Sequence, residues 1–430
     1  MAEFNSTKLP WLVASDGNGN VFEIPGLEMV GMRINEKILP VPDELIPIPH
    51  GSVLVELPDR YPVGYDRKRD KFVTMKTYQG HPVIAAAVFM APAYTQLYRA
   101  AYQTKSDAVK LPLFAYTPVG WKNDQFWAPA IRVDDDIRQD LIHFNFDLIE
   151  KSAQQMMKRF PNNRLVAHLV NNCVRHYYCP AAQNFVLGRW ECPVSISPSC
   201  NAKCIGCISK QPEDGVPVTQ DRITFVPTVE EILEFTVPHL GNAPRSIISF
   251  GQGCEGEPLL QAKLLEESIR QTRRFTSKGT INLNSNACYP DVIERLCHAG
   301  LDSIRVSLNS ARPELYIKYY RPQDYSIEDV FESMKIMRQC NRWISLNYFI
   351  FPGLTDDPAE MEQLIKIVTD YRVDYIQMRN LNIDPEWYIQ ELELDLKTSK
   401  AIGILNWQRS VKEKAPWIRF GYYNPPKEDW

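Results

Sequence analysis

From about residue 191, short apolar runs alternate with amphipathic stretches, and this order constrains the fold more than any other feature. A repeated strand–helix order gives parallel strands joined by right-handed crossovers. We therefore predict an α/β fold, a partial (βα)6 TIM-like barrel that stops short of the eight units needed for closure. The six runs expected to be strands are residues 193–197, 246–250, 280–284, 303–309, 344–350 and 374–381.

The stretches between these runs carry helix signals. Thr228 and Glu231 form a T-x-x-E capping box, and Asp357 precedes a Pro358 suited to the first helical position. The apolar stripes, such as that of Ile327 to Met337, are interpreted as core packing.

Residues 1–190 have a different texture, rich in proline and aromatic residues. Strand-like runs occur at 51–58, 81–90 and 124–133, and helical signal is concentrated between Asp136 and Arg159. We predict that residues 1–190 form an N-terminal region that is mostly β and contains a helix. No role is assigned to this region. Residues 191–430 then form the barrel core with a C-terminal helix and tail.

Composition excludes some classes of function. A net charge of −4 argues against a protein that wraps a nucleic acid backbone, and no run of about 18 apolar residues could span a membrane. The first 20 residues lack the pattern of a secretory signal, so a cytoplasmic protein is expected. Six of the ten cysteines lie between Cys173 and Cys207, which in a reducing compartment indicates metal binding or catalysis before disulfides.

The segment SCNAKCIGC (199–207) follows the first predicted strand and has the spacing C-x3-C-x2-C. Thiolates are the usual ligands of iron–sulfur clusters, and a four-iron cluster normally takes four. Three ligands, Cys200, Cys204 and Cys207, would leave one iron open for chemistry. A zinc knuckle and incidental buried thiols are the alternatives, but a zinc knuckle would require a fourth Cys or His at knuckle spacing, and none follows nearby.

The triplet and four other motifs, spread over residues 190–385, together resemble the radical SAM superfamily. GQGCEGEPLL (251–260) is similar to its Gly-Gly-Glu-Pro motif, and LNSNA (283–287) is similar to its Thr-Asn-Gly-type turn. SIRVSLNS (303–310) and YFIFPGLTDD (348–357) are similar to patterns of the branches that make molybdenum cofactor or modify peptides.

The resemblance implies a [4Fe–4S] cluster on the three cysteines and S-adenosylmethionine (SAM) as cofactor. Reductive cleavage of SAM would give a 5′-deoxyadenosyl radical that abstracts hydrogen from an organic substrate, such as a peptide or cofactor precursor. Gly256 and Glu257 would place backbone groups against the SAM amino group. The expected contacts of the SAM ribose and carboxylate are Ser285, Asn286 and Ser307.

Several alternatives stay open. The substrate could instead be a small molecule or nucleotide, and a rival from another class is a non-catalytic iron–sulfur or zinc-binding protein. An electron donor such as flavodoxin or ferredoxin is an expected partner, whereas a membrane or nucleic acid is not.

Two positions depart from the family pattern. Gly206 stands where a bulky residue usually precedes the third cysteine, so Ile205 or Ile208 is expected to fill that space. Glu255 replaces the first glycine of the Gly-Gly-Glu-Pro motif.

The other cysteines allow two interpretations. Cys173, Cys179 and Cys192 could bind an auxiliary iron–sulfur cluster, with His176 as a further ligand, or could be buried thiols. Cys254 and Cys288 follow strands at the expected active-site mouth and are weak candidates for a catalytic hydrogen-atom donor. Cys297 and Cys340 are interpreted as structural, and no cysteine follows Cys340 in this sequence.

Overall fold

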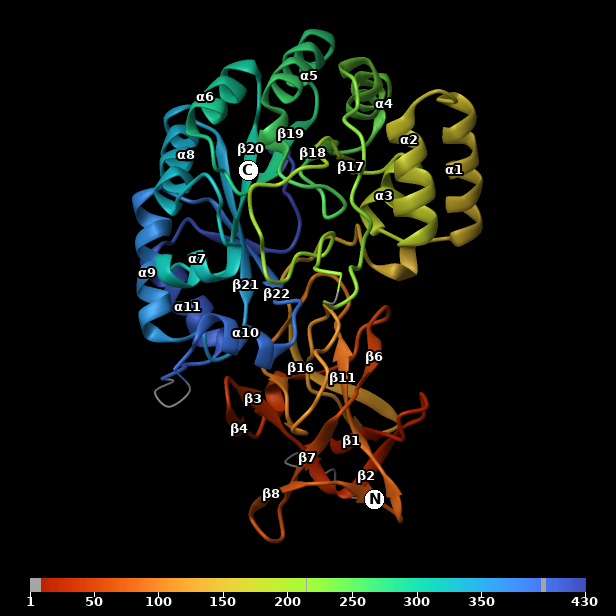
Figure 1. The fold of residues 1–430 in the computed structure, drawn as a ribbon, viewed down its shortest axis with the longest axis vertical. Helices are drawn as coiled ribbons and strands as arrows, with labels where there is room; N and C mark the ends of the chain where they lie inside the picture. Colours follow the sequence, from red (N-terminus) through yellow and green to blue (C-terminus); the bar gives the residue numbers. More distant parts are fainter. Residues whose placement is uncertain (1–8, 214, 396–399) are drawn as a thin grey trace. The chain divides into compact units, whose positions relative to one another are not determined.

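The computed structural model describes residues 9–213, 215–395 and 400–430 (Figure 1). The chain forms two compact units. The first contains the described residues up to Asp135 together with Phe349–Glu362 and Met378–Lys414, and the second contains Asp136–Tyr348, Gln363–Gln377 and Ala415–Trp430. The units thus change at residue 135, and the predicted domain boundary at residue 190 stays a prediction. Residues 1–8, on which the signal-peptide expectation partly rests, lie outside the described residues.

The second unit is built on a seven-stranded sheet in the order β17-β18-β19-β20-β21-β22-β23. The pairings from β17 to β21 and of β22 with β23 are parallel. The predicted α/β fold is confirmed, because all six expected strands are present, with β23 as an addition. The strands are β17 (Glu191–Val194), β18 (Ile247–Phe250), β19 (Thr280–Ser285), β20 (Ser303–Leu308), β21 (Trp343–Ile350), β22 (Tyr375–Asn380) and β23 (Arg419–Gly421).

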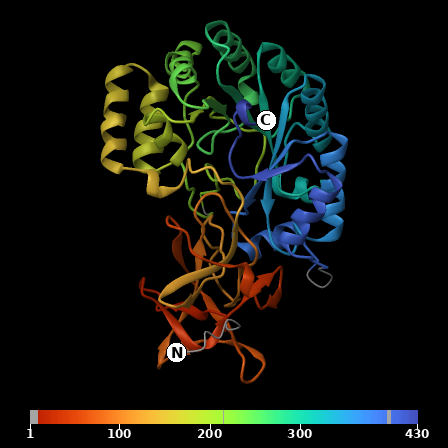
Figure 2. The same cartoon turned by 180° about the vertical axis from the view of Figure 1, so that it is seen from behind.

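Helices connect these strands, and Figure 2 shows several of them along one face of the sheet. The capping box of Thr228 and Glu231 is present at the start of α4, and Asp357 accepts a hydrogen bond from the backbone of Ala359 in the first turn of α9. The helices are α4 (Val229–Asn242), α5 (Ala262–Phe275), α6 (Pro290–Ala299), α7 (Pro313–Tyr320), α8 (Ile327–Gln339) and α9 (Pro358–Asp370).

A helical extension precedes β17 and belongs to the second unit. The sequence predicted one helix here, whereas the structure has α1 (Phe146–Arg159), α2 (Arg164–His168), a π-helix (Leu169–His176) and α3 (Pro180–Val186). α3 packs beside β17, and α2 contacts α4. The first strand of the parallel sheet is therefore covered by residues outside the predicted core.

The first unit is mostly antiparallel, and β1 pairs with β2, β11 and β15. The predicted runs at 51–58, 81–90 and 124–133 correspond to β6, β11 and β16. The strands are β1 (Trp11–Ser15), β2 (Val21–Met29), β3 (Gly31–Arg33), β4 (Glu36–Ile38), β5 (Leu45–Pro47), β6 (Val53–Leu57), β7 (Arg60–Asp66), β8 (Lys71–Thr74), β9 (Thr77–Tyr78), β10 (His81–Pro82), β11 (Ile84–Phe89), β12 (Tyr94–Gln96), β13 (Arg99–Ala100), β14 (Tyr102–Thr104), β15 (Gly120–Lys122) and β16 (Gln125–Arg132).

The first unit also contains the segments that continue β21 and β22, including α10 (Pro385–Leu392) and α11 (Ile404–Lys414). Asp384 ties α10 to the β strands through a buried ion pair with Arg60 at 2.8 Å and a hydrogen bond from the backbone of Leu111. Its other carboxylate oxygen caps α10. Within the described residues, no helix combines the length and apolar character needed to cross a membrane.

Candidate active site

The three clustered cysteines lie on one loop after β17. This loop is fastened to the end of α7, because Lys203 N donates to Tyr320 O (2.9 Å) and Ile205 N donates to Tyr319 O (3.0 Å). Cys200, Cys204 and Cys207 are partly exposed as residues, in contrast to the buried Cys173 and Cys254.

Electrostatics at the triplet disfavour free thiolates. Burial, followed by the nearby Glu257 carboxyl, raises the pKa of Cys200 to about 11. Burial and then the two neighbouring thiols raise the pKa of Cys204 well above its usual value. Arg222 Nη2 lies 3.4 Å from Cys207 Sγ and supplies one positive charge. A bound metal would supply the remaining charge, since metal binding displaces thiol protons.

The turn after β18 packs backbone against backbone at two glycines. A Cβ atom on Gly251, whose φ is +82°, would lie 1.8 Å from Asn284 O, and one on Gly256 would lie 1.9 Å from Ser199 O. The contact at Gly256 joins this turn to the cysteine loop. Gly256 N donates to Ser197 O (2.7 Å), and Glu257 N donates to Ser199 O (2.8 Å).

Glu255, the departure from the family motif, holds this turn together. One carboxylate oxygen accepts hydrogen bonds from the backbone of Gly251 and Gln252, and the other accepts from Ile196 and Ser197. Burial raises the pKa of Glu255 to about 8, against the effect of these donors. The side chain therefore binds the end of β17 to the turn after β18.

The Glu257 carboxylate forms hydrogen bonds to other groups of the protein. It accepts hydrogen bonds from Ser285 Oγ (2.6 Å), Asn286 N (2.9 Å) and Leu259 N (3.0 Å). Burial raises its pKa to about 7. The turn after β18 is thus fixed to the turn after β19, and the backbone of the first turn is held in place by its own side chain.

The structure places Ser285 and Asn286 beside Glu257 and leaves Ser307 outside those hydrogen bonds. Asn286 Nδ2 donates to Asn201 Oδ1 (2.9 Å), which connects the β19 turn to the cysteine loop. Ser307 lies on β20 opposite Asn347 of β21. Of the three residues predicted to contact the SAM ribose and carboxylate, Ser285 and Asn286 are therefore connected through Glu257, whereas Ser307 lies on a separate strand.

Comparison with known proteins gives a family match over this region. Residues 194–365 match the family model of the Radical SAM superfamily. Within this chain, residues 194–365 are therefore similar to the Radical SAM superfamily of enzymes. This confirms the resemblance of the motifs at the level of the superfamily, whose members use a [4Fe–4S] cluster and SAM.

Curated relatives include GTP 3′,8-cyclases. The protein from Streptomyces coelicolor is 24% identical over 197 residues, which cover 45% of this chain and 54% of the relative. That from Clostridium botulinum (strain Hall) is 28% identical over 219 residues, covering 49% and 64%. The match thus spans between half and two thirds of these relatives. A solved structure of methylornithine synthase is 13% identical, covers 63% of this chain and 78% of its own, and has a TM-score of 0.37.

Two tyrosines, Tyr316 and Tyr325, lie near Cys204 and Glu257 and were not predicted from the sequence. Tyr316 OH donates to Tyr325 OH (3.3 Å), and burial raises the pKa of both phenols. Both lie close enough to Cys204 and Glu257 for those charges to raise their pKa further. The aromatic run YIKYY (316–320) was the only available signal.

The sequence also gave no sign of the role of Asn424, which lies in the C-terminal segment. Asn424 is buried, and its side-chain nitrogen donates to Glu191 Oε1 (2.8 Å) and Ser249 Oγ (3.3 Å). Its side-chain oxygen accepts from Gln377 Nε2 (2.8 Å). One tail residue therefore bonds to side chains of β17, β18 and β22.

The remaining cysteines are grouped in an unexpected way. Cys254 is buried with Sγ 3.7 Å from Cys173 Sγ, rather than open at the mouth as expected. Cys288 is buried close to Glu257, whose charge adds to burial in raising the pKa of its thiol. Cys192 is buried in β17, and its Sγ contacts Pro193 O.

The interpretation of Cys297 and Cys340 as structural stays a prediction. Cys297 is buried with Sγ 3.4 Å from Met337 Sδ. His176, suggested as a further ligand, is exposed at the end of the π-helix. Ile205 is buried. Ile208 packs on Gly253, where an added Cβ would lie 2.6 Å from Ile208 Cδ1. Which of the two fills the space beside Gly206 stays a prediction.

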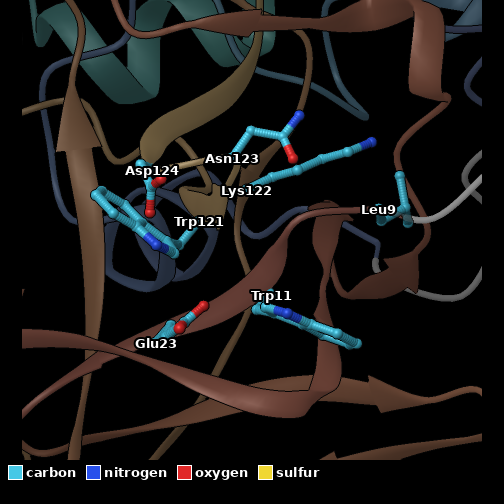
Figure 3. Close-up of a pocket in the computed structure, with 7 residues that line it drawn as sticks. All are labelled: Leu9, Trp11, Glu23, Trp121, Lys122, Asn123 and Asp124. Carbon is cyan, nitrogen blue, oxygen red and sulfur yellow. The ribbon is translucent and has the colours of Figure 1, made fainter. Parts of the chain in front are cut away.

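A separate pocket of about 320 Å³ lies within the first unit (Figure 3). Trp11 and Trp121 are cross-strand partners of β1 and β15 and border this pocket together with Glu23. None of the predicted site residues lines it. The other lining residues are Leu9, Lys122, Asn123 and Asp124.

Proposed function

We propose that Cys200, Cys204 and Cys207 hold a [4Fe–4S] cluster with which the enzyme cleaves SAM reductively. The observation that carries this proposal is the pair of backbone hydrogen bonds between the cysteine loop and the Gly256–Glu257 turn. They make the loop that would bind the cluster and the turn that would bind the SAM amino group into one unit.

The residues present fit these cofactors. Three partly exposed cysteines on one loop suit a cluster that keeps one iron accessible, and the Gly256 contact leaves no room for a side chain between loop and turn. When bound, the cluster supplies the electron that converts SAM into methionine and a 5′-deoxyadenosyl radical able to abstract hydrogen from substrate.

The protein groups have positioning roles in this proposal. Backbone groups at Gly256 and Glu257 orient the SAM amino group, and the Glu257 side chain keeps that backbone fixed to Ser285 and Asn286. Ser285, Asn286 and Ser307 are the proposed contacts of the SAM ribose and carboxylate. Catalysis of this kind depends on a preorganised site that excludes water.

For the substrate we propose a nucleotide, with GTP as the first compound to test. This rests on the names of the relatives at 24% and 28% identity, which match only part of their length. A peptide or cofactor precursor is the alternative. Flavodoxin or ferredoxin is the proposed electron donor.

The proposal is tested by anaerobic reconstitution with iron and sulfide, followed by incubation with SAM and dithionite. We expect 5′-deoxyadenosine to form, and to form faster when GTP is added. Acceleration by a peptide extract but not by nucleotides would overturn the substrate proposal alone. Absence of 5′-deoxyadenosine under every condition would overturn the proposed reaction.

A further inference from the structure

A second group of metal-ligating atoms lies inside the second unit. His168 ends α2, Cys173 lies in the π-helix, and Cys254 lies in the turn after β18. The three ligand atoms all lie within 4.8 Å of one another. Cys173 Sγ is 3.7 Å from Cys254 Sγ and 4.0 Å from His168 Nε2.

These distances fit a single ion. A tetrahedral Zn²⁺ with thiolates at about 2.3 Å holds the two sulfurs roughly 3.8 Å apart, close to the observed separation. A histidine nitrogen at about 2.0 Å from the ion would lie roughly 3.5 Å from each sulfur. His168 Nε2 lies 4.0 Å from Cys173 Sγ, so the imidazole would have to move closer to bind the ion. A disulfide would instead need the two sulfurs about 2.0 Å apart.

The local backbone explains how residues so far apart in sequence meet. A π-helix has i→i+5 hydrogen bonds, here from Tyr177 N to Asn172 O (3.0 Å), and such segments are frequent at functional sites. This winding brings His168 and Cys173, five positions apart, to one side of the segment. Cys254, 81 positions after Cys173, is held by a hydrogen bond from Ile223 N to its carbonyl (2.8 Å).

We propose that His168, Cys173 and Cys254 bind one Zn²⁺ ion, with Ser195 Oγ bordering the fourth coordination position. The ion fastens the helical extension to the turn after β18. The site is independent of the cluster on the Cys200 loop, and it shares no ligand with that cluster.

The test uses the full-length chain carrying Cys200→Ala, Cys204→Ala and Cys207→Ala, so that bound metal has to come from elsewhere. We expect about one zinc per chain after dialysis against zinc and then buffer. Replacing zinc by Co²⁺ should produce thiolate-to-cobalt absorption in the near ultraviolet. A chain that retains neither zinc nor this absorption would overturn the proposal, whether or not SAM cleavage is found in the native enzyme.

Single substitutions in that background locate the ion. Cys173→Ser and Cys254→Ser should each abolish the thiolate–cobalt absorption, and His168→Gln should weaken zinc binding at least tenfold. Cys297→Ser is the matched control, a buried thiol elsewhere in the unit, and it should keep the metal. Retention of the full absorption in Cys173→Ser would overturn the site. Formation of a Cys173–Cys254 disulfide by a chain that binds no metal would assign the pair to redox chemistry and overturn it as well.

Discussion

The chain builds its two sulfur-rich sites in opposite ways. Cys200, Cys204 and Cys207 lie within one loop and are partly exposed as residues. The second site draws Cys173 and Cys254 from segments 81 positions apart, and both thiols are buried. One site is local and accessible, and the other exists only because the fold brings distant segments together.

This difference teaches what each site can do. Each group offers three protein ligands, so burial and not the number of ligands distinguishes the two sites. The accessible loop suits a cofactor that has to meet SAM, and the buried group suits an ion that holds segments in place. The turn 251–257 connects them, because it carries Cys254 at one site and contacts the cysteine loop through Gly256 at the other.

The largest expected effect comes from removing the accessible site. Simultaneous Cys200→Ala, Cys204→Ala and Cys207→Ala substitution should abolish 5′-deoxyadenosine formation and the brown colour of anaerobically purified protein, because no cluster ligands remain. Cleavage is measured by chromatography after incubation with SAM and dithionite. Cys297→Ala serves as the control and should leave the yield unchanged. Full SAM cleavage by the triple variant would contradict the assignment of the loop.

A smaller effect is expected from the turn between the sites. Replacing Glu257 and Pro258 with alanine removes three hydrogen bonds to the carboxylate and the proline that holds Glu257 extended. The distorted turn should then lose one or two charge-assisted hydrogen bonds to the SAM amino group. At roughly 1.5–3 kcal/mol each, this loss should weaken SAM binding about tenfold or more. Iron content should stay near normal, since another loop holds the cluster.

Equilibrium dialysis with labelled SAM measures this effect. Glu267→Ala, a partly exposed glutamate on α5, is the control and should bind SAM as the unaltered chain does. Unchanged SAM affinity in the Glu257 and Pro258 variant would show that this turn is not the SAM-binding motif.

The accessible site was more predictable from sequence than the buried one. Its three cysteines follow one strand, so spacing alone places them together, and the strand–helix alternation predicted the six strands that position the loop. Sequence could not give the direction of the Cys254 side chain, which was expected at the mouth and instead contacts Cys173. Pairing between remote segments depends on the π-helix, for which the sequence offers no periodic signal.

The missed elements have the same cause. β23 has only three residues, Arg419–Gly421, and exists because the tail pairs with β22. Asn424 is one polar residue in that tail, and its role comes from the strands it meets. Likewise, Glu255 departs from the family motif in the sequence. Only the structure shows that its carboxylate accepts hydrogen bonds from four backbone N–H groups.

A pH effect separates the buried turn from the accessible loop. Burial raises the pKa of Glu257 from its ordinary 4.5 to about 7, so the folded chain binds a proton more tightly than the unfolded chain. The resulting stabilisation is present below about pH 4.5 and is lost as pH rises through 7, by up to about 3 kcal/mol. Urea unfolding of the metal-free protein at pH 5 and pH 8 measures this loss.

Glu257→Gln provides the comparison, because it removes the titrating group and leaves Glu255 in place. The free energy of unfolding should fall less between pH 5 and pH 8 in this variant than in the unaltered chain. Equal falls in the two proteins would mean that Glu257 does not take up a proton in the folded state.

The smallest expected effect is on iron content when the buried thiols are removed, and it is the sharpest test of the contrast between the sites. Three thiolates on the accessible loop hold one cubane, which predicts about four iron per chain after full reconstitution. A single zinc ion at Cys173 and Cys254 adds no iron, and neither would buried thiols alone. Cys173→Ser together with Cys179→Ser should therefore leave iron at about four per chain, measured by plasma emission against protein concentration. About eight iron in the unaltered chain, falling to about four in that variant, would instead establish an auxiliary iron–sulfur cluster. The buried group would then be a second cluster site, and the distinction between an accessible redox site and a buried structural one would be wrong.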